Sequence, residues 1–184
     1  MDITSTGNFN NQFKRPNTSK PIVGHATITA YANNLSQAQA GADLVAGQAV
    51  EIKTQASGTQ AGSGFNPNVL VAKTATSTIG GFVIESPNFV VIEGAQASKA
   101  LKGQIVYVAT IGSGVEVYVP CKASEFQGFA VGSQVYYDST NGELTTTKGT
   151  NIALNVAVVS NVVDSIKAQA DGTFAECQAV KIKL

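Results

Sequence analysis

The sequence predicts an all-β protein, an antiparallel β-barrel or sandwich with an extended N-terminal arm. Short segments rich in β-branched and aromatic residues follow one another at near-regular intervals, and Gly-rich turns separate them. No stretch of ten or more residues has apolar positions at three- and four-residue spacing. Strands so spaced, with almost no helix, are typical of barrels and sandwiches. We expect residues 1–21 to form the arm and residues 22–184 the β domain.

The arm has no sustained hydrophobic period and is rich in Asn, Thr and Ser. Phe9 and Phe13 are its only large aromatic residues, and we expect them to pack on the body or to dock on a neighbouring subunit. Lys14 and Arg15 contribute to a net charge of +2 in the arm, whereas the rest of the chain holds 9 basic and 11 acidic residues. The arm charge fits either an acidic partner or simple solvation.

Period-two alternation begins at Ile22 and continues to residue 31, which predicts the first strand. Further strand segments are expected to begin at Ala46, Val69, Gly80, Asn88, Gln104, Val115, Gln134, Glu143, Asn151 and Phe174. Residues 33–41 fit one helical turn or a loop, and residues 54–64 a Gly-rich loop. Residues 95–103 are the best, though brief, helix candidate.

Two turns predict hairpins. Gly112-Ser113-Gly114 lies between two alternating runs, and Asn141-Gly142 offers two residues that tolerate positive φ. A Gly-x-x-Val pattern also recurs at the strand entries, beginning at Gly47, Gly103 and Gly132. Because its spacings are unequal, we interpret the pattern as shared turn chemistry rather than as a solenoid repeat.

The composition disfavours several classes of partner. Charged residues make up 13% of the chain, about half the roughly 25% of an average soluble domain, and the formal net charge is zero. No global field therefore draws the protein to nucleic acid or to an anionic membrane. No apolar run approaches the roughly 20 residues that cross a bilayer, and the N-terminus does not begin a signal peptide. We expect synthesis in the cytoplasm.

The sequence offers little for catalysis. His25 is the only histidine and is expected to be an ordinary strand or surface residue. Cys121 and Cys177 lie far apart without metal-type spacing, and a disulfide between them fits the sequence but is not required. The carboxylates occur singly, although distant ones could converge in the fold. We expect no catalytic residues, no metal and no cofactor, and we expect that the protein is not an enzyme.

Four tyrosines leave one binding interpretation open. Tyr107, Tyr118, Tyr136 and Tyr137 could form an aromatic platform for a sugar or a base. Because alternation places Tyr136 and Tyr137 on opposite faces, at least one of them is expected in the core.

One segment resembles a known family. The run from Phe129 through Gly132 to Asp138, followed by Asn141-Gly142-Glu143-Leu144-Thr145, resembles the "G-x-x-V-Y-x-D … G-x-L-T" hairpin of tailed-bacteriophage capsid decoration, or cement, proteins. Residues 46–51 look like the turn and strand near the start of the same domain, and residues 69–84 are similar to its middle strands. The resemblance spans roughly residues 43–160, so the arm and the segment after Asp164 have no counterpart in it.

The resemblance implies a virion structural protein that binds the outer surface of an icosahedral phage head at high copy number and stabilises it. Its partners would be the major capsid protein and further copies of itself, and its location the capsid exterior. Phe9, Phe13, Lys14 and Arg15 are the residues expected to contribute to docking, and deletion of residues 1–21 is expected to leave a folded protein that no longer binds. Two alternatives stay open: another assembly component, such as a tail, fibre or pilus subunit, and a carbohydrate-binding β module.

Overall fold

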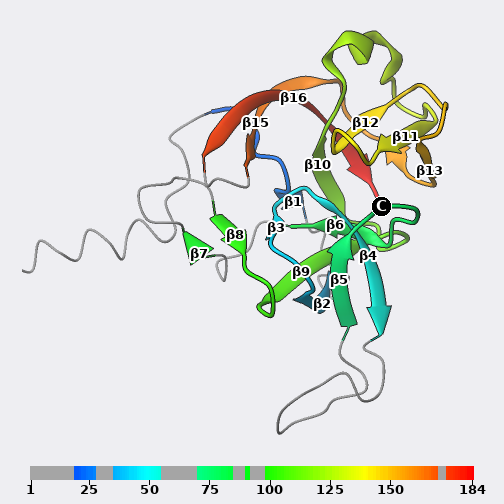
Figure 1. Cartoon of the computed structure of the whole chain (residues 1–184). Helices are drawn as coiled ribbons and strands as arrows, with labels where there is room; N and C mark the ends of the chain where they lie inside the picture. The colour runs from blue at the N-terminus through cyan, green and yellow to red at the C-terminus, as the bar shows by residue number, and fades with distance from the viewer. Residues whose placement is uncertain (1–18, 28–34, 55–69, 85–89, 92–97, 170–172) are drawn as a thin grey trace, which may run out of the picture.

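The computed structural model describes residues 19–27, 35–54, 70–84, 90–91, 98–169 and 173–184. These residues form short strands and one 3-10 helix, η3 (Ala123–Gly128). The strands build a small barrel and three sheets (Figure 1). The predicted all-β class is confirmed, and all strand pairs are antiparallel except one in the barrel. The arm residues 1–18 lie outside the described part.

The barrel has five strands and closes through the pairing of its first and last strands. In spatial order its strands are β2 (Leu35–Ala40), β5 (Leu70–Thr74), β4 (Ala49–Thr54), β6 (Gly81–Val83) and β9 (Ile105–Thr110). The β2–β5 pair is the parallel one. A small antiparallel sheet adjoins in the order β3 (Leu44–Val45), β8 (Ser98–Ala100) and β7 (Val90–Val91).

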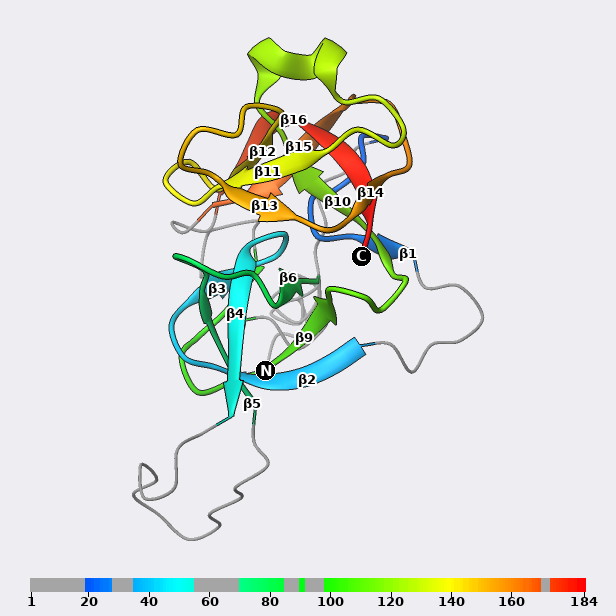
Figure 2. The ribbon, with the colours of Figure 1, turned by 90° about the vertical axis from the view of Figure 1, so that its right-hand side faces the viewer.

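Beside the barrel lie two antiparallel sheets, as the rotated view also shows (Figure 2). The larger contains β1 (Ala26–Thr27), β10 (Glu116–Pro120), β14 (Ala157–Val158), β15 (Val163–Ala168) and β16 (Phe174–Lys183), with β16 pairing β10, β14 and β15. The smaller has the order β12 (Glu143–Thr145), β11 (Val135–Asp138) and β13 (Ile152–Leu154).

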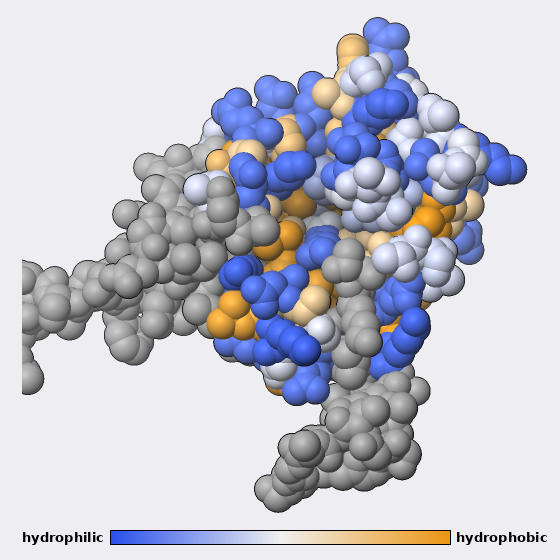
Figure 3. Space-filling view, in the orientation of Figure 1, coloured by the Kyte–Doolittle hydropathy of each residue, from blue (hydrophilic) through white to orange (hydrophobic). Residues whose placement is uncertain are grey.

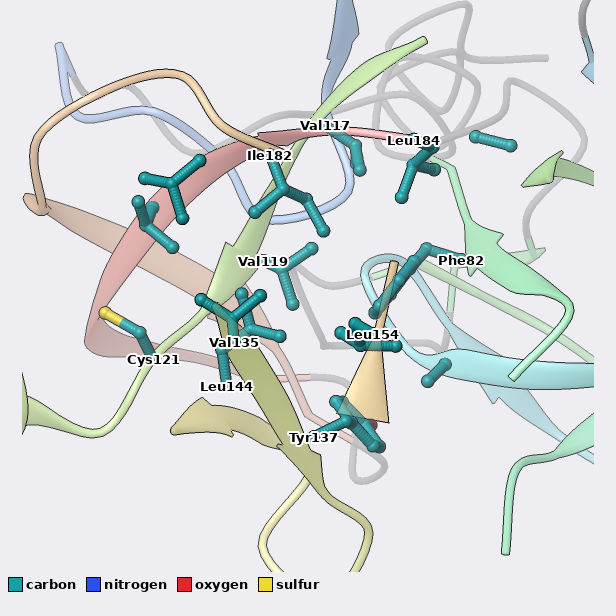
Figure 4. Close-up of a cluster of buried hydrophobic side chains, with 14 of the residues drawn as sticks. Phe82, Val117, Val119, Cys121, Val135, Tyr137, Leu144, Leu154, Ile182 and Leu184 are labelled. Atoms are coloured by element: carbon teal, nitrogen blue, oxygen red, sulfur yellow. The ribbon is translucent and has the colours of Figure 1, made fainter. Parts of the chain in front are cut away.

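Alternation on the barrel strands produces two hydrophobic cores. Val50, Val83 and Val108 belong to a cluster of small side chains that fills the barrel. Their chain neighbours Ala49 and Phe82 belong instead to a larger cluster shared with the two sheets. Figure 4 shows Phe82 near residues from those sheets, including Leu154 and Tyr137. The Phe82 and Tyr137 rings meet edge to face, with centroids 6.0 Å apart. Phe82 therefore joins the barrel to the rest of the core.

Two segments in which the sequence predicts no strand contain strands. Residues 35–40 form β2, where Ala38 and Ala40 are buried and Gln37 and Gln39 face outward. In this segment small residues alternate with glutamines, so it has the period of a strand but lacks the large apolar side chains that usually reveal one. The candidate helix at 95–103 contains β8 instead, since pairing with β3 and β7 outweighs the helix propensity of its alanines and lysines. β15 is a further strand that was not predicted from the sequence.

The first predicted strand is interrupted within residues 22–27. Ile22 makes an isolated bridge to Ile166, a turn follows, and the described part of the strand, β1, is Ala26–Thr27. Residues 28–31 of that prediction, and the loop predicted at 54–64 from residue 55 onward, lie outside the described part. The run that begins at Asn151 is divided between β13 and β14, which belong to different sheets.

One predicted hairpin is confirmed and the other is wrong. β11 and β12 pair as expected, with Tyr137 opposite Leu144, although only Gly142 has a positive φ, of 69°. The turn at residues 112–114 is not a hairpin, because β9 stays in the barrel whereas β10 pairs with β1 and β16. The Leu184 carbonyl accepts a hydrogen bond from the Gly114 N–H at 2.6 Å. The C-terminal strand β16 thus pairs with β10 in the position that β9 would have in a hairpin. Alternation alone does not determine which strands pair.

The three Gly-x-x-Val sites share one local structure. Gly47, Gly103 and Gly132 have φ values of 82°, 92° and 83°, and the valine three residues later is fully buried each time. After each glycine, the next side chain accepts a hydrogen bond from the backbone N–H three residues before it, as Gln104 Oε1 does from Leu101 N at 2.8 Å. The pattern is therefore a recurrent turn that starts a strand, as interpreted from the sequence.

A buried carboxylate holds the segment between β5 and β6. Glu51 is 8% exposed, and its Oε1 accepts hydrogen bonds from the backbone N–H and hydroxyl groups of Thr76 and Ser77 at 3.3–3.4 Å. Its Oε2 lies 2.9 Å from Lys53 Nζ. The Lys53 ammonium has the largest effect on the pKa of Glu51, and the backbone N–H groups of Thr76 and Ser77 have the next largest. Together they lower this pKa to about 2 from the ordinary 4.5.

This low pKa predicts a pH-dependent contribution to stability. The ionised Glu51 contributes fully above about pH 4.5, and the contribution is lost as the pH falls from there toward 2. We therefore expect Glu51→Gln to be less stable than the parent at pH 7, with a gap that narrows as the pH falls through that window. Thermal unfolding at pH 7, 4 and 2.5 measures the gap, and a gap that does not change with pH contradicts the assignment. Glu116→Gln, which removes a 3.7 Å ion pair to Lys181, is the control and should give a smaller gap at pH 7.

Candidate interaction surface

The most prominent exposed apolar side chains lie on one projection. We define the η3 projection as residues 122–132, the segment that follows β10 and contains η3. Phe126 is 51% exposed and Val131 is 70% exposed, the highest values among the large hydrophobic residues that the structure describes. Both ribbon views place η3 at the outer end of the molecule, on the side away from the barrel (Figures 1 and 2).

Glu125 fixes the η3 projection to the end of β12. One carboxylate oxygen, Oε2, accepts hydrogen bonds from Thr145 Oγ1 at 2.7 Å and from the backbone N and hydroxyl of Thr146 at 2.7 and 2.8 Å. The other, Oε1, accepts from Thr147 Oγ1 at 3.1 Å and lies 2.8 Å from Lys122 Nζ. Partial burial acts to raise the pKa of Glu125, but these donors outweigh it and hold the pKa well below its usual range.

The other end of the η3 projection is anchored in the core. Phe129 is 3% exposed and belongs to the larger hydrophobic cluster. A turn follows in which the Ser133 N–H donates to the Ala130 carbonyl at 2.9 Å, and the Ala130 N–H donates back to Ser133 Oγ at 3.2 Å. Phe126 and Val131 are thus exposed on a segment that is held on both sides, so little conformational entropy is left to lose on binding.

The surface around the projection is mostly polar. Figure 3 shows hydrophilic and neutral residues over most of the described surface on one face, with hydrophobic residues in separate spots. Leu101, 38% exposed, directly follows β8, and Ile105, 46% exposed, is the first residue of β9 in the barrel. They are the other large hydrophobic residues exposed in the described part.

A groove of about 490 Å³ is a second candidate site. It lies between the turn before β4, the tip of the β11–β12 hairpin and the end of β15. Asp43 spans part of it, accepting from Lys99 Nζ at 3.0 Å and from the Lys102 N–H at 3.1 Å. Tyr137 is the aromatic residue in its lining, and it is 3% exposed. The described lining therefore offers mixed polar groups but no exposed aromatic ring.

The arm residues predicted to dock, Phe9, Phe13, Lys14 and Arg15, lie outside the described residues. The segment that follows them is tied to the β domain. Lys20 Nζ lies 2.6 Å from Glu176 Oε1, and the Pro21 carbonyl accepts hydrogen bonds from Ser165 Oγ at 2.6 Å and Ile166 N at 3.1 Å. Among the described residues, contacts with the body therefore begin before residue 22, the start expected for the β domain.

The other residues singled out from the sequence are dispersed. Tyr107, Tyr118 and Tyr136 lie on β9, β10 and β11, in three different sheets, so the four tyrosines do not form one platform. Tyr137 is in the core, on the face opposite to Tyr136, as alternation predicted. His25 is exposed at the turn before β1.

Neither cysteine is in a disulfide. Burial raises the pKa of Cys121 to about 12 and that of Cys177 to about 11, so both thiols are poor nucleophiles at neutral pH. Within the described ranges, no group of three or more His, Cys, Asp and Glu side chains could hold a metal ion. Nor does any helix in these ranges have the length and apolar character to span a membrane.

Comparisons with known proteins give no relative: no family model, no curated protein and no solved structure matches the chain.

Neither Phe126 nor Glu125 was predicted from the sequence as a site residue. One signal was present in the sequence. A glutamate and a phenylalanine stand next to each other between two strand segments, and three consecutive threonines, residues 145–147, begin with the last residue of the next hairpin. A carboxylate can meet so many hydroxyl groups only if these segments lie side by side. The proximity of these two segments is a feature of the tertiary structure, and no local sequence pattern predicts it.

Proposed function

We propose that this protein is a virion structural protein, a capsid decoration (cement) protein that binds the outer surface of an icosahedral phage head and stabilises it. The observation that carries the proposal is the hairpin of residues 129–145, which resembles that of the decoration family. Its partners would be the major capsid protein and further copies of itself, and its place the capsid exterior. Its role is structural rather than catalytic and needs no cofactor.

The roles of the motif residues in the fold support the use of this resemblance. Val135, Tyr137 and Leu144 are the buried side chains that attach the hairpin to the core. Gly132 and Gly142 provide positive φ at the two turns. The motif positions are therefore the buried and turn residues of a packed β11–β12 unit, which supports the proposal.

The surface suits repeated contacts with many neighbours. Few charges have to be desolvated at an interface when 13% of all residues are charged and the net charge is zero. Each copy then contributes a modest contact, and the large number of identical sites on a closed shell multiplies the effect through multivalency.

The arm is the first docking element to test, through Phe9, Phe13, Lys14 and Arg15. Because Lys20 and Pro21 contact β15 and β16, deletion of residues 1–18 is a cleaner truncation than deletion of residues 1–21. We expect the shorter truncation to keep the parent melting temperature and to lose most capsid binding in a co-sedimentation assay. Unchanged binding would remove the arm from the docking surface.

The function itself is tested by quantitative mass spectrometry of density-banded particles from the source culture. We expect this chain to band with the major capsid protein, at a copy number comparable to that of the shell subunit. Its absence from the particles would overturn the proposal. Presence at only a few copies per particle would contradict decoration of the shell and favour a tail or fibre component. Glycan-array binding without particle association would favour a carbohydrate-binding module.

A further inference from the structure

We infer that the η3 projection is a second docking element, which inserts Phe126 into an uncharged apolar pocket on the shell protein. This inference rests on the proposed function, since it names the partner. Its first ground is exposure: a phenylalanine that is 51% exposed leaves a large apolar surface in water, and aromatic side chains of this kind dominate the energetics of protein interfaces.

The second ground is that the structure supports this side chain without covering it. The Glu125 carboxylate accepts hydrogen bonds from three consecutive threonines directly beside Phe126, and Phe129 anchors the far end in the core. An exposed loop needs no such anchoring in order to be soluble. Pre-organisation of this type reduces the entropy cost of binding and is expected where a loop presents an anchor residue.

The third ground is charge. In the η3 projection, the charged side chains Lys122 and Glu125 lie 2.8 Å apart and neutralise each other. The tip therefore presents neither a basic patch for an anionic lipid surface nor a net charge for an oppositely charged protein site. The surface complementary to it is uncharged and apolar.

The fourth ground is shape. The projection is convex and lies at the end of the molecule in both ribbon views (Figures 1 and 2). Two convex tips cannot bury much area against each other, so a symmetric contact between two copies through this surface is disfavoured. The exposed parts of Phe126 and Val131 are also far smaller than the roughly 1,200 Å² that a stable interface buries. The tip would therefore act as one anchor within a larger contact.

The test uses particles that lack this protein, to which the purified full-length chain is added, with binding followed by co-sedimentation. We expect Phe126→Ser to weaken binding about tenfold or more, and Phe126→Leu to retain most of it. The matched control is Ile105→Ser, an equally drastic change at a residue that is 46% exposed on the barrel, and it should bind as the parent does. Equal melting temperatures for the four proteins show that folding is unaffected.

The outcomes separate the two proposals. If the parent binds and Phe126→Ser binds equally well, the inference about the projection is overturned while the decoration function stands. A loss confined to Ile105→Ser would overturn it in favour of the barrel end. If the parent binds phospholipid vesicles through Phe126 and does not bind particles, the protein partner is wrong. Failure of the parent to bind particles at all would overturn both proposals.

Discussion

Phe82→Ala is expected to lower the free energy of unfolding by about 3–5 kcal/mol. Phe82 is completely buried and belongs to β6 of the barrel, yet its ring packs in the cluster formed with the two neighbouring sheets. The substitution removes the edge-to-face contact with Tyr137 and leaves a cavity at the junction of the barrel and the sheets. Because small domains are stable by only 5–15 kcal/mol, this loss is a large part of the total.

Urea unfolding followed by circular dichroism measures the effect. Phe126→Ala is the matched control, since it is the same chemical change at a residue that is 51% exposed, and it should change stability by no more than about 0.5 kcal/mol. Similar losses for the two variants would contradict the placement of Phe82 in the shared core. An unfolding transition that splits in two for Phe82→Ala would support its role as the joint between barrel and sheets.

The sequence was sufficient to predict the fold class because most strands have one buried and one solvated face. Period-two alternation is then local, and β9, β10 and β11 all begin within two residues of their predicted starts. The turns were predictable for a similar reason, since a turn is decided by about four consecutive residues. The glycines at 47, 103 and 132 have the positive φ that such turns require.

Pairing was not predictable, because alternation identifies a strand without its partner. The turn at residues 112–114 joins two alternating strands, as a hairpin turn would. However, β9 closes the barrel by pairing with β2, and β10 pairs with β16, more than 50 residues later. The chain resolves this choice through long-range packing, which includes the burial of Leu184 at the C-terminus beside Val115. Pairing also explains why the brief helix candidate at 95–103 contains β8, since β8 is held by β3 and β7.

The candidate interaction surface was only partly accessible from sequence. The arm could be identified from the sequence because its aromatic residues are not part of any local hydrophobic period, so they have no core of their own in which to pack. Phe126, by contrast, follows a strand and precedes Phe129, so it looks like one more core residue. Only the fold shows that Phe129 is buried and that Phe126 is not.

Gly24→Ala is expected to be nearly as damaging as the loss of Phe82, for a different reason. Gly24 has a φ of 81°, and it lies against a second turn whose Gly47 has a φ of 82°. A Cβ at residue 24 would lie 2.5 Å from the Gly47 backbone nitrogen and 2.7 Å from Ala46 Cβ. The substitution therefore adds backbone overlap to left-handed strain, and we expect a loss of about 2–5 kcal/mol.

Gly132→Ala separates the cost of left-handed backbone strain from the cost of steric overlap. Gly132 has nearly the same φ, of 83°, but a Cβ there would meet no atom within 4 Å. This control carries the left-handed strain alone and should cost about 1–2 kcal/mol in the same urea titration. A loss for Gly24→Ala no larger than that of Gly132→Ala would show that the two turns can move apart. In that case the segment that leads from the arm would not be fixed against the barrel at this point.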